Sequence, residues 1–451
     1  MVAESKSLTG WGRTAPTVAS VVAASSAVQL ADALQAAGPR GVIPRGLGRS
    51  YGDAAQNAGG TVLDMTTLRR VHSVDADTGL VDTDAGVSLD ELMQRTLPFG
   101  LWIPVLPGTR QVTVGGAIAA DVHGKNHHVH GSFGNHVRSL ELLLADGTVQ
   151  TLTPDGDTAA EFWATVGGMG LTGVILRARI QLAPVETAYF SVDTERTANL
   201  DELMIKLAEG DDRHTYSVAW FDSVSRGNSL GRAVITRGRS ARVDELPLKL
   251  RRAPLASDAP RLGTAPPVFP GGLLNRVSVG AFNELWYRKA PRERRGEIQN
   301  ITTFFHPLDV IGDWNRIYGP RGFLQYQFVV PFGAEDAVRV AVEAISASGH
   351  VSFLNVLKRF GAANPGPLSF PMPGWTLAVD MPVRAGLAEL CDELDELVLA
   401  AGGRIYLAKD SRVDAATLAR MYPRLDEWRK VRDALDPDGV FSSDLQRRLS
   451  L

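Results

Sequence analysis

The sequence predicts a protein of the α+β class with two domains. Its 451 residues exceed what one hydrophobic core normally supports. Strand and helix signals alternate at short spacing over residues 1–185, which is typical of a layered α/β or α+β structure. Polar and apolar residues alternate at 325–330 and 376–381, which predicts two strands of a sheet. Amphipathic helices at 335–348 and 388–402 suit one face of that sheet.

The N-terminal elements follow from local signals. Ser26 is typical of a helix N-cap. Ser88-Leu-Asp-Glu91 has the pattern of a capping box, and Asp146-Gly147 between two apolar runs predicts a hairpin. We therefore expect helices at 26–36, 88–99 and 159–165, and strands at 17–22, 41–44, 61–65, 101–106, 140–145, 148–152 and 173–182.

The second half of the chain contains a Pro/Gly-rich stretch from Arg252 to Gly280. It has too few periodic apolar positions for a regular element, so we expect a mobile loop or lid there. A helix is expected around 418–435, and the compact ending Asp436-Pro-Asp-Gly-Val-Phe441 follows it.

Composition excludes several classes of protein. The formal net charge is −3 and the basic residues are scattered, which argues against a nucleic-acid-binding protein. The one cysteine, Cys391, cannot form an internal disulfide, and its leucine neighbours predict a buried helix position. No apolar segment is long enough to span a bilayer, and the N-terminus lacks the pattern of an export signal. We therefore expect a soluble protein that is not classically exported.

Three glycine-rich segments, at 45–53, 107–116 and 166–173, lie in the first half of the chain. In the first segment, Gly46, Gly48 and Gly52 allow backbone N–H groups to converge on an anion, and Arg45 and Arg49 add positive charge. Together the three segments favour a long cofactor that lies across the N-terminal domain.

Residues 121–131 contain four of the nine histidines and directly follow the small residues 113–120. Three interpretations are open. The cluster from His123 to His130 fits a zinc site of a metal-dependent hydrolase, although the usual neighbouring acid is missing. The histidines also suit an ordinary hydrogen-bonded loop. The third interpretation is the wall of a cofactor site, because Gly115 and Gly116 remove side chains that would collide with a planar ligand.

Several motifs together resemble the vanillyl-alcohol-oxidase type of FAD flavoprotein. They are Gly46-Leu-Gly-Arg-Ser, Thr113-Val-Gly-Gly-Ala, His123-Gly, Gly167-Gly-Met-Gly-Leu-Thr-Gly and the C-terminal Asp-Pro-Asp-Gly-Val-Phe. Further motifs, including Asp121-Val-His-Gly-Lys-Asn-His-His, Phe323-Leu-Gln-Tyr-Gln-Phe and Ala408-Lys-Asp-Ser-Arg, are similar to the branch of this family that oxidises a polyprenyl-phosphoryl ribose.

The resemblance implies an enzyme that uses FAD to oxidise the 2′-hydroxyl of decaprenylphosphoryl-β-D-ribose to a 2′-keto intermediate. This reaction is the first half of an epimerisation to decaprenylphosphoryl-arabinose for cell-wall arabinan. The implied partner is an NAD(P)H-dependent keto-reductase, because the chain has no dinucleotide fingerprint of its own. The family also implies peripheral membrane contact and a location in the cytoplasm or at the inner envelope, including its periplasmic face. An aldonolactone or alditol oxidase is the alternative.

The resemblance also implies the domain organisation and the cofactor site. We expect an FAD-binding domain at 1–187, a substrate-binding domain at 188–403 and a C-terminal return to the FAD-binding domain at 404–451. Many family members tether the flavin through a histidine where this chain has Arg49, so the FAD is expected to be non-covalent. The expected cofactor-binding residues are Arg45, Gly46, Gly48, Arg49, Ser50, Tyr51, Gly52, Pro107, Gly108, Thr109, Thr113, Gly115, Gly116, Ala117, Ala120, His123, Gly124, Asn126, Gly173, Val174, Tyr406 and Lys409.

Lys409 is the strongest candidate for chemistry. Oxidation of an alcohol needs a base or a polarising cation near the hydroxyl oxygen, and a buried lysine can serve in either role. His123 and Tyr51 are the other expected catalytic residues, through hydrogen bonds near the sugar or the flavin, and no metal is implied. The expected substrate-binding residues are Trp220, Gln325, Tyr326, Gln327, Asn355, Lys358 and Ala378. Among these, Lys358 suits a lipid phosphate, and Ala378 stands where mycobacterial family members carry a cysteine.

Overall fold

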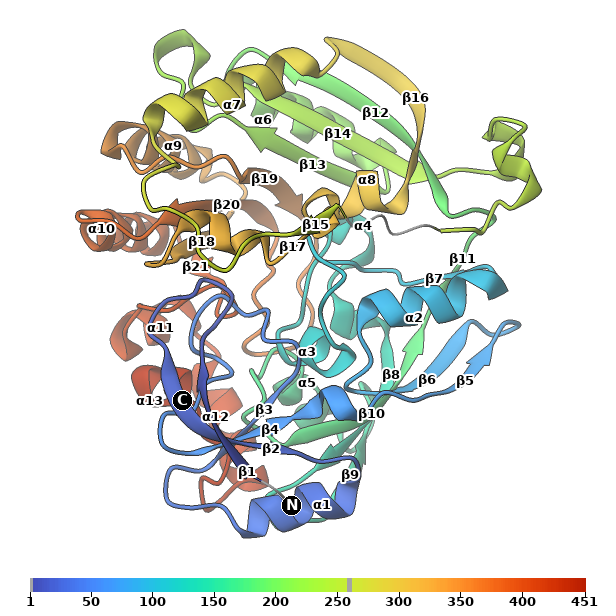
Figure 1. The fold of residues 1–451 in the computed structure, drawn as a ribbon, viewed down its shortest axis with the longest axis vertical. Coiled ribbons are helices and arrows are strands. Elements are labelled where there is room, and N and C mark those ends of the chain that lie inside the picture. The colour runs from blue at the N-terminus through green and yellow to red at the C-terminus, as the bar shows by residue number, and fades with distance from the viewer. Residues whose placement is uncertain (1–2, 258–261) are drawn as a thin grey trace.

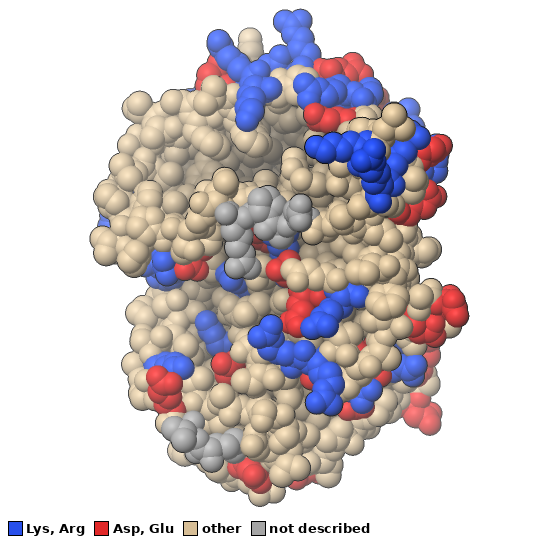
Figure 2. Space-filling view, turned by 45° about the vertical axis from the view of Figure 1, so that its right-hand side comes forward, with Lys and Arg blue, Asp and Glu red and all other residues tan. Residues whose placement is uncertain are grey.

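The computed structural model describes residues 3–257 and 262–451. Figure 1 shows an upper region built around one large sheet and a lower region that contains two smaller sheets and both chain termini. In Figure 2 the basic and acidic side chains of the visible face are interspersed, except over a hollowed, uncharged area in the upper half.

The lower region contains a four-stranded and a five-stranded sheet. In the first, β2, β4 and β3 pair in parallel and β1 joins antiparallel to β2. All pairs of the second sheet are antiparallel. The strands of the first are β1 (Ala3–Leu8), β2 (Thr17–Ala23), β4 (Thr61–Asp64) and β3 (Val42–Arg45), and those of the second are β5 (Val71–Asp75), β6 (Leu80–Asp84), β10 (Val174–Gln181), β8 (Val137–Leu143) and β9 (Val149–Leu152).

The upper region is an eight-stranded antiparallel sheet. Its strands, in spatial order, are β16 (Glu293–Asn300), β12 (Tyr189–Thr197), β14 (Ala233–Ser240), β13 (Tyr216–Phe221), β19 (Asn355–Phe360), β20 (Gly374–Pro382), β18 (Phe323–Pro331) and β21 (Arg404–Ile405). Helices α6 (Leu200–Gly210), α9 (Glu335–Ser348) and α10 (Leu387–Ala400) contact these strands. Their apolar faces form one core with the sheet, and Cys391 is buried in α10 as expected.

The remaining elements connect and cover these sheets. The short strand pairs are β7 (Leu101–Trp102) with β11 (Ala183–Pro184), and β15 (Gly263–Thr264) with β17 (Ile311–Gly312). The other helices are α1 (Ala27–Gln35), α2 (Leu89–Thr96), α3 (Val114–Ala119), α4 (His127–His130), α5 (Ala159–Thr165), α7 (Arg276–Lys289), α8 (Ile301–Phe305), α11 (Ala415–Met421), α12 (Leu425–Leu435) and α13 (Asp444–Leu449).

The C-terminal segment after β21 lies against the N-terminal sheet. Phe441 forms a parallel bridge with Val42, and the Asp444 carboxylate accepts a hydrogen bond from the Ala58 N–H at 3.0 Å. In Figure 1 the red C-terminal helices accordingly lie beside the blue strands. The expected domain boundaries at 187/188 and 403/404 stay predictions.

Three expectations about local structure are wrong. The strand expected at 101–106 is only two residues long, because Pro104 has no N–H for a ladder. The helix expected at 418–435 is divided into α11 and α12, because Pro423 cannot continue the first. The stretch from Arg252 to Gly280 is not devoid of regular structure: α7 begins at Arg276, where Asn275 caps the N–H groups of Val277 and Ser278.

The other expected strands and helices are present near their expected positions. The sequence analysis missed α13, which begins after the Ser443 cap. Residues 258–261 of the expected loop lie outside the described residues. Across the part of the chain that the structure describes, every helix is too short or too polar to cross a bilayer.

Candidate active site

A cavity of about 690 Å³ lies between the large sheet and the N-terminal glycine-rich segments. This volume is within the range of natural ligand sites. One wall, which we call the glycine wall, comes from residues 44–55, 106–125 and 169–175. The opposite wall, the strand wall, carries side chains from β13, β14, β18, β19 and β20 and the segment 406–409.

The glycine wall is built so tightly that side chains are excluded from it. A Cβ atom at Gly46 would lie 2.2 Å from the Thr113 hydroxyl, and one at Gly52 would lie 1.9 Å from the Asp410 carbonyl oxygen. Gly48 has φ +64°, a left-handed conformation that glycine adopts without strain. At these three glycines the loop 45–53 therefore has no room for a side chain.

Two arginines fix this loop. Arg45 donates to the carbonyl oxygens of Ala55 and Thr9, each at 2.8 Å. The Arg49 guanidinium lies over the Trp11 ring, 3.9 Å from its centroid. Burial lowers the pKa of both guanidinium groups, and they stay cationic because arginine titrates so far above neutrality.

Most of the expected cofactor-binding residues line this cavity. The residues that do are Arg45, Gly46, Gly48, Arg49, Ser50, Tyr51, Pro107, Gly108, Thr109, Thr113, Gly115, Gly116, Ala120, His123, Gly124, Gly173, Tyr406 and Lys409. Gly52, Ala117, Asn126 and Val174 are outside its lining and support the wall from behind. Asn126, for example, donates to the Pro104 carbonyl at 2.7 Å.

His123 presents an unused hydrogen-bonding atom in the cavity wall. Its Nε2 is 2.9 Å from the Gln327 amide nitrogen, whereas its Nδ1 has no partner among the described residues. Burial, and then the positive charge of Lys358, lower the pKa of His123 well below its usual value, so the ring is neutral. With Nε2 accepting from Gln327, the proton lies on Nδ1 and is available to a ligand.

The other histidines of the cluster bind backbone groups. His127 Nδ1 accepts from the Gly361 N–H at 3.1 Å, and His128 Nε2 lies 2.9 Å from the His214 carbonyl oxygen. Within the described residues no group of three His, Cys, Asp or Glu side chains is placed to hold a metal ion. The geometry of the cluster therefore does not support the metal-dependent hydrolase.

Lys409 projects from the strand wall toward the same space. Its ammonium lies 3.8 Å from the centroid of the Tyr51 ring. Burial lowers the pKa of Lys409 to about 7, an effect that Asp380 opposes and Lys358 reinforces. Near neutral pH the amine is therefore present in both its neutral and its protonated form.

Asp380 completes a buried network beside Lys409 that the sequence analysis missed. Its carboxylate accepts from the Gln325 amide at 2.5 Å and from the Tyr318 hydroxyl at 3.2 Å. The same Gln325 amide is 3.4 Å from the Tyr51 hydroxyl. Burial raises the pKa of Asp380 to about 7. Alternation along β20 places Asp380 on the face of Ala378, and this signal was available in the sequence.

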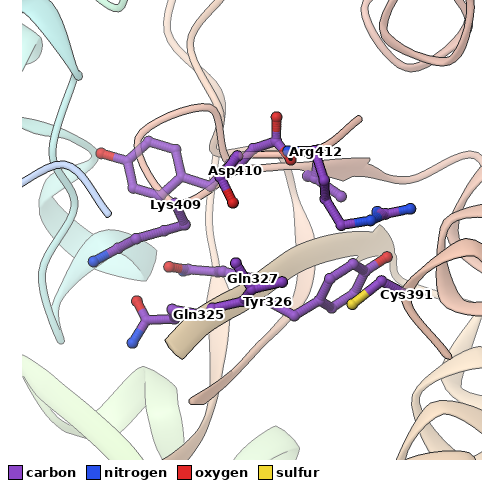
Figure 3. A pocket seen from close by; sticks show the side chains of 11 residues that line it. Gln325, Tyr326, Gln327, Cys391, Lys409, Asp410 and Arg412 are labelled. Carbon is purple, nitrogen blue, oxygen red and sulfur yellow. Dashed lines mark hydrogen bonds between the residues drawn. The ribbon is translucent and has the colours of Figure 1, made fainter. Parts of the chain in front are cut away.

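The expected substrate-binding residues fall into two groups. Trp220, Gln325, Gln327, Lys358 and Ala378 line the cavity, and Tyr326 and Asn355 do not. Figure 3 shows Lys409, Gln325 and Gln327 pointing to one side of the sheet and Tyr326 pointing to the other. The Tyr326 hydroxyl donates to Asp395 at 2.7 Å, and the Asn355 amide donates to the Phe221 carbonyl at 3.0 Å.

Arg448 is a second residue that the sequence analysis missed. Its guanidinium donates to Asp53 at 2.9 and 2.8 Å and to Asp410 at 2.8 Å. It therefore joins the glycine-rich loop to the residue after Lys409 from behind the cavity. The Tyr51 N–H, which donates to the Ala408 carbonyl at 2.8 Å, makes a second link. Because α13 itself was missed, the sequence offered no signal for this contact.

These features suit FAD. The backbone groups and the fixed arginines of the glycine wall suit the binding of a pyrophosphate. The His123 N–H, which has no partner among the described residues, suits a hydrogen bond to a polar atom of a ring or a sugar. Gly46, Gly48, Gly115 and Gly116 line the cavity, and its volume of about 690 Å³ suits a large ligand.

Comparisons with known proteins also indicate an FAD-binding protein. Residues 18–153 match the family model described as FAD binding domain, and residues 379–449 match that described as D-arabinono-1,4-lactone oxidase. The chain is 58% identical over 450 residues to decaprenylphosphoryl-β-D-ribose oxidase of Mycolicibacterium smegmatis, which covers 99% of this chain and 98% of that protein. It is 24% identical over 438 residues to L-gulono-1,4-lactone dehydrogenase of Mycobacterium tuberculosis, covering 95% of each.

Fold, cavity and matches together define an FAD-dependent oxidoreductase of the vanillyl-alcohol-oxidase type. The chain belongs to the decaprenylphosphoryl-β-D-ribose oxidase family. The predicted fold class, cofactor and family are thereby confirmed, whereas the roles of individual residues stay predictions.

Proposed function

We propose that this enzyme oxidises the 2′-hydroxyl of decaprenylphosphoryl-β-D-ribose to the 2′-keto sugar, the first half of an epimerisation to the arabinose lipid used for cell-wall arabinan. The observation that carries the proposal is Lys409, a buried amine in the strand wall that faces the glycine wall across one cavity. The 58% identical relative with the matching name supports the choice of substrate.

In this proposal Lys409 is the base. FAD held by the glycine wall would supply the hydride acceptor for the carbon that carries the hydroxyl. The neutral Lys409 amine takes the hydroxyl proton, and the pKa of about 7 makes that form available at neutral pH. The Tyr51 ring holds the amine in place, and Gln325 contacts the Tyr51 hydroxyl. The His123 N–H donates to a ring or sugar oxygen.

The FAD is held without a covalent bond. Arg49 stands where many family members carry the tethering histidine, and arginine cannot form that bond. We therefore expect denaturation to release all of the flavin into solution, as measured by absorbance after ultrafiltration. Yellow colour that stays with the denatured chain contradicts this part of the proposal.

Anaerobic reduction of the holoenzyme tests the substrate. Decaprenylphosphoryl ribose is expected to bleach the flavin, whereas xylitol and gulonolactone are expected to leave it oxidised. The match of residues 379–449 to a lactone oxidase makes the lactone the relevant competitor. Bleaching by gulonolactone at a comparable rate supports that alternative and contradicts the proposed substrate.

The second half of the epimerisation requires a separate NAD(P)H-dependent keto-reductase. With NADPH and the 2′-keto product, this chain alone is expected to form no arabinose epimer, and adding such a reductase is expected to produce it. Arabinose formation by the chain alone contradicts the need for a partner.

We also propose that α7 contacts the membrane that holds the lipid. Val277 and Leu285 are 82% and 68% exposed, and Phe282 and Trp286 are stacked on the outside of the helix, whereas the polar Asn283 is buried against Asp222. Trp286 and Lys289 line the cavity, so the apolar surface of α7 adjoins it. An apolar helix face of this kind suits the boundary of a bilayer.

Vesicle binding tests the role of α7. Replacing Val277 and Leu285 by serine is expected to weaken co-sedimentation with anionic vesicles. The matched control is Val340→Ser, at an exposed valine of α9, which is expected to bind as the wild type does. Equal binding by all three proteins, or self-association through α7 in place of vesicle binding, contradicts membrane contact.

A further inference from the structure

Two lysines of the cavity wall lack an acidic partner. Lys125, from the loop after α3, and Lys358, on β19, both line the cavity and are partly buried. Within the described residues neither forms an ion pair with a carboxylate. Arg237 and Arg110, whose side chains also have little exposure, are paired with Glu195 at 2.6 Å and with Asp90 at 3.2 Å. Unpaired cations in a cavity wall indicate that the missing negative charge comes from a ligand.

The contacts of each lysine leave donors free. Lys125 Nζ donates to the Phe304 carbonyl and lies 4.6 Å from the Phe304 ring centroid, which fixes the amine and uses one of its three donors. Lys358 Nζ lies 5.8 Å from the Phe360 ring centroid. Both amines are thus positioned by aromatic rings rather than by an anion of the protein.

Lys125, Lys358 and Lys409 line the same cavity, and the charge of Lys358 affects both of the other amines. Burial is the main cause that lowers the pKa of Lys125 to about 7 and of Lys409 to about 7, and Lys358 lowers both further. Burial alone lowers the pKa of Lys358 to about 8. The Lys125 carbonyl accepts a hydrogen bond from the Ser217 N–H of β13 at 2.8 Å, and β13 pairs with β19, the strand that carries Lys358. An anion held near Lys125 and Lys358 would favour their protonated forms.

We propose that Lys125 and Lys358 together form the binding site for the phosphodiester of the lipid-linked sugar. The inference rests on the proposed function. In a ribose 1-phosphodiester the phosphate and the 2′-hydroxyl are on adjacent carbons, so the phosphate site must lie in the same cavity as the base, and Lys358 and Lys409 both line that cavity. The FAD phosphates have a separate cradle in the loop 45–53 with its two arginines.

Steady-state kinetics of the FAD-loaded enzyme test this site. Lys125→Met and Lys358→Met are each expected to raise KM for decaprenylphosphoryl ribose about tenfold, the loss of one charge-assisted hydrogen bond, and to change kcat by less than about threefold. Lys125→Arg retains the charge and is expected to restore most of the affinity. Lys430→Met, at an exposed lysine of α12, is the matched control with wild-type KM.

A phosphate-free substrate separates this site from a structural role. For decaprenyl riboside, which lacks the phosphate, the wild type and both methionine variants are expected to share one KM. Two results overturn the phosphate site. One is a tenfold difference in KM between the variants and the wild type that persists for the phosphate-free substrate. The other is a KM for decaprenylphosphoryl ribose that neither substitution changes. Inorganic phosphate titrated into the holoenzyme gives a second measurement, with weaker binding expected in Lys125→Met than in Lys430→Met.

The outcomes distinguish the two proposals. If phosphate binds through both lysines but no ribose lipid is oxidised, the anion site stands and the proposed function fails. If the ribose lipid is oxidised and neither lysine affects its KM or phosphate binding, the function stands and the anion site fails.

Discussion

The two walls of the cavity present different chemistry to their ligands. The glycine wall offers backbone groups and small residues, and its arginines are occupied with carbonyl oxygens and the Trp11 ring. The strand wall offers amine, amide and carboxyl side chains whose charges are not fixed near neutral pH, such as Lys409 and Asp380. We therefore expect added side-chain volume to disrupt the function of the glycine wall, and the removal of a charged group to disrupt the function of the strand wall.

This difference follows from the kind of element that forms each wall. Loops close to a helix or strand end can direct consecutive backbone groups at a ligand. Strands in a complete sheet have no free backbone groups, so only alternate side chains reach the cavity. Recognition of the cofactor is thus expected to depend on shape, and catalysis on a few titratable groups.

The largest expected effect is on the strand wall. Replacing Lys409 by Met removes the proposed base without adding bulk, and is expected to slow flavin reduction by about 10³-fold while FAD remains bound. Anaerobic stopped-flow absorbance measures the reduction, and Lys430→Met serves as the control. A Lys409→Met enzyme that is reduced within tenfold of the wild-type rate contradicts the assignment.

The glycine wall should show the opposite sensitivity. Gly52→Ala places a Cβ atom 1.9 Å from the Asp410 carbonyl oxygen, so the loop and the Lys409 segment must separate. We expect FAD affinity to fall by about 100-fold, which corresponds to the upper range for overpacking. Gly38→Ala, where a Cβ meets no atom within 4 Å, is the matched control. Fluorescence titration with FAD measures both, and unchanged affinity in Gly52→Ala contradicts the tight packing.

The pH dependence of flavin reduction tests the charge state of the strand wall. The base is the neutral form of Lys409, so the rate is expected to rise with pH and level off above about 7, falling about tenfold per pH unit below it. Ionised Asp380 favours the protonated lysine, so Asp380→Asn is expected to move the midpoint to lower pH. A rate that falls as pH rises identifies Lys409 as a cation that stabilises charge instead.

Sequence reasoning located the glycine wall more completely than the strand wall. Its motifs are contiguous, so the local sequence indicated Gly46 and Gly115, and the family resemblance added His123. On the strand wall, Gln325, Tyr326 and Gln327 were assigned together, although adjacent residues of a strand point to opposite faces, and Tyr326 lies on the other side. The alternation along β20 could have placed Asp380 on the face of Ala378. Arg448 acts through contacts with residues distant in sequence, which no local pattern encodes.

A smaller effect is expected where the two walls are joined. Arg448→Met leaves the carboxylates of Asp53 and Asp410 without their shared cation, and should reduce the free energy of unfolding by about 2 kcal/mol because the group is partly exposed. FAD affinity should fall severalfold, less than in Gly52→Ala. Urea denaturation and FAD titration measure these changes. The comparison is Arg447→Met, which removes the contact of Arg447 with Asn57 and keeps the link between Arg448 and Asp410. Wild-type FAD affinity in Arg448→Met contradicts a positioning role.

The smallest expected effect sharpens the contrast, because the strand wall should tolerate modest bulk that the glycine wall cannot. Ala378 lines the cavity, and Ala378→Cys adds one sulfur atom toward open space, so flavin reduction should change by less than about twofold. The wild type should not react with a thiol reagent, since Cys391 is buried in α10 and burial raises its thiol pKa to about 12. The variant should therefore acquire one label per chain in intact-protein mass measurements, and bound substrate should slow that labelling. Labelling of the wild type contradicts the burial of Cys391, and an unlabelled Ala378→Cys protein shows that position 378 does not face the cavity as described.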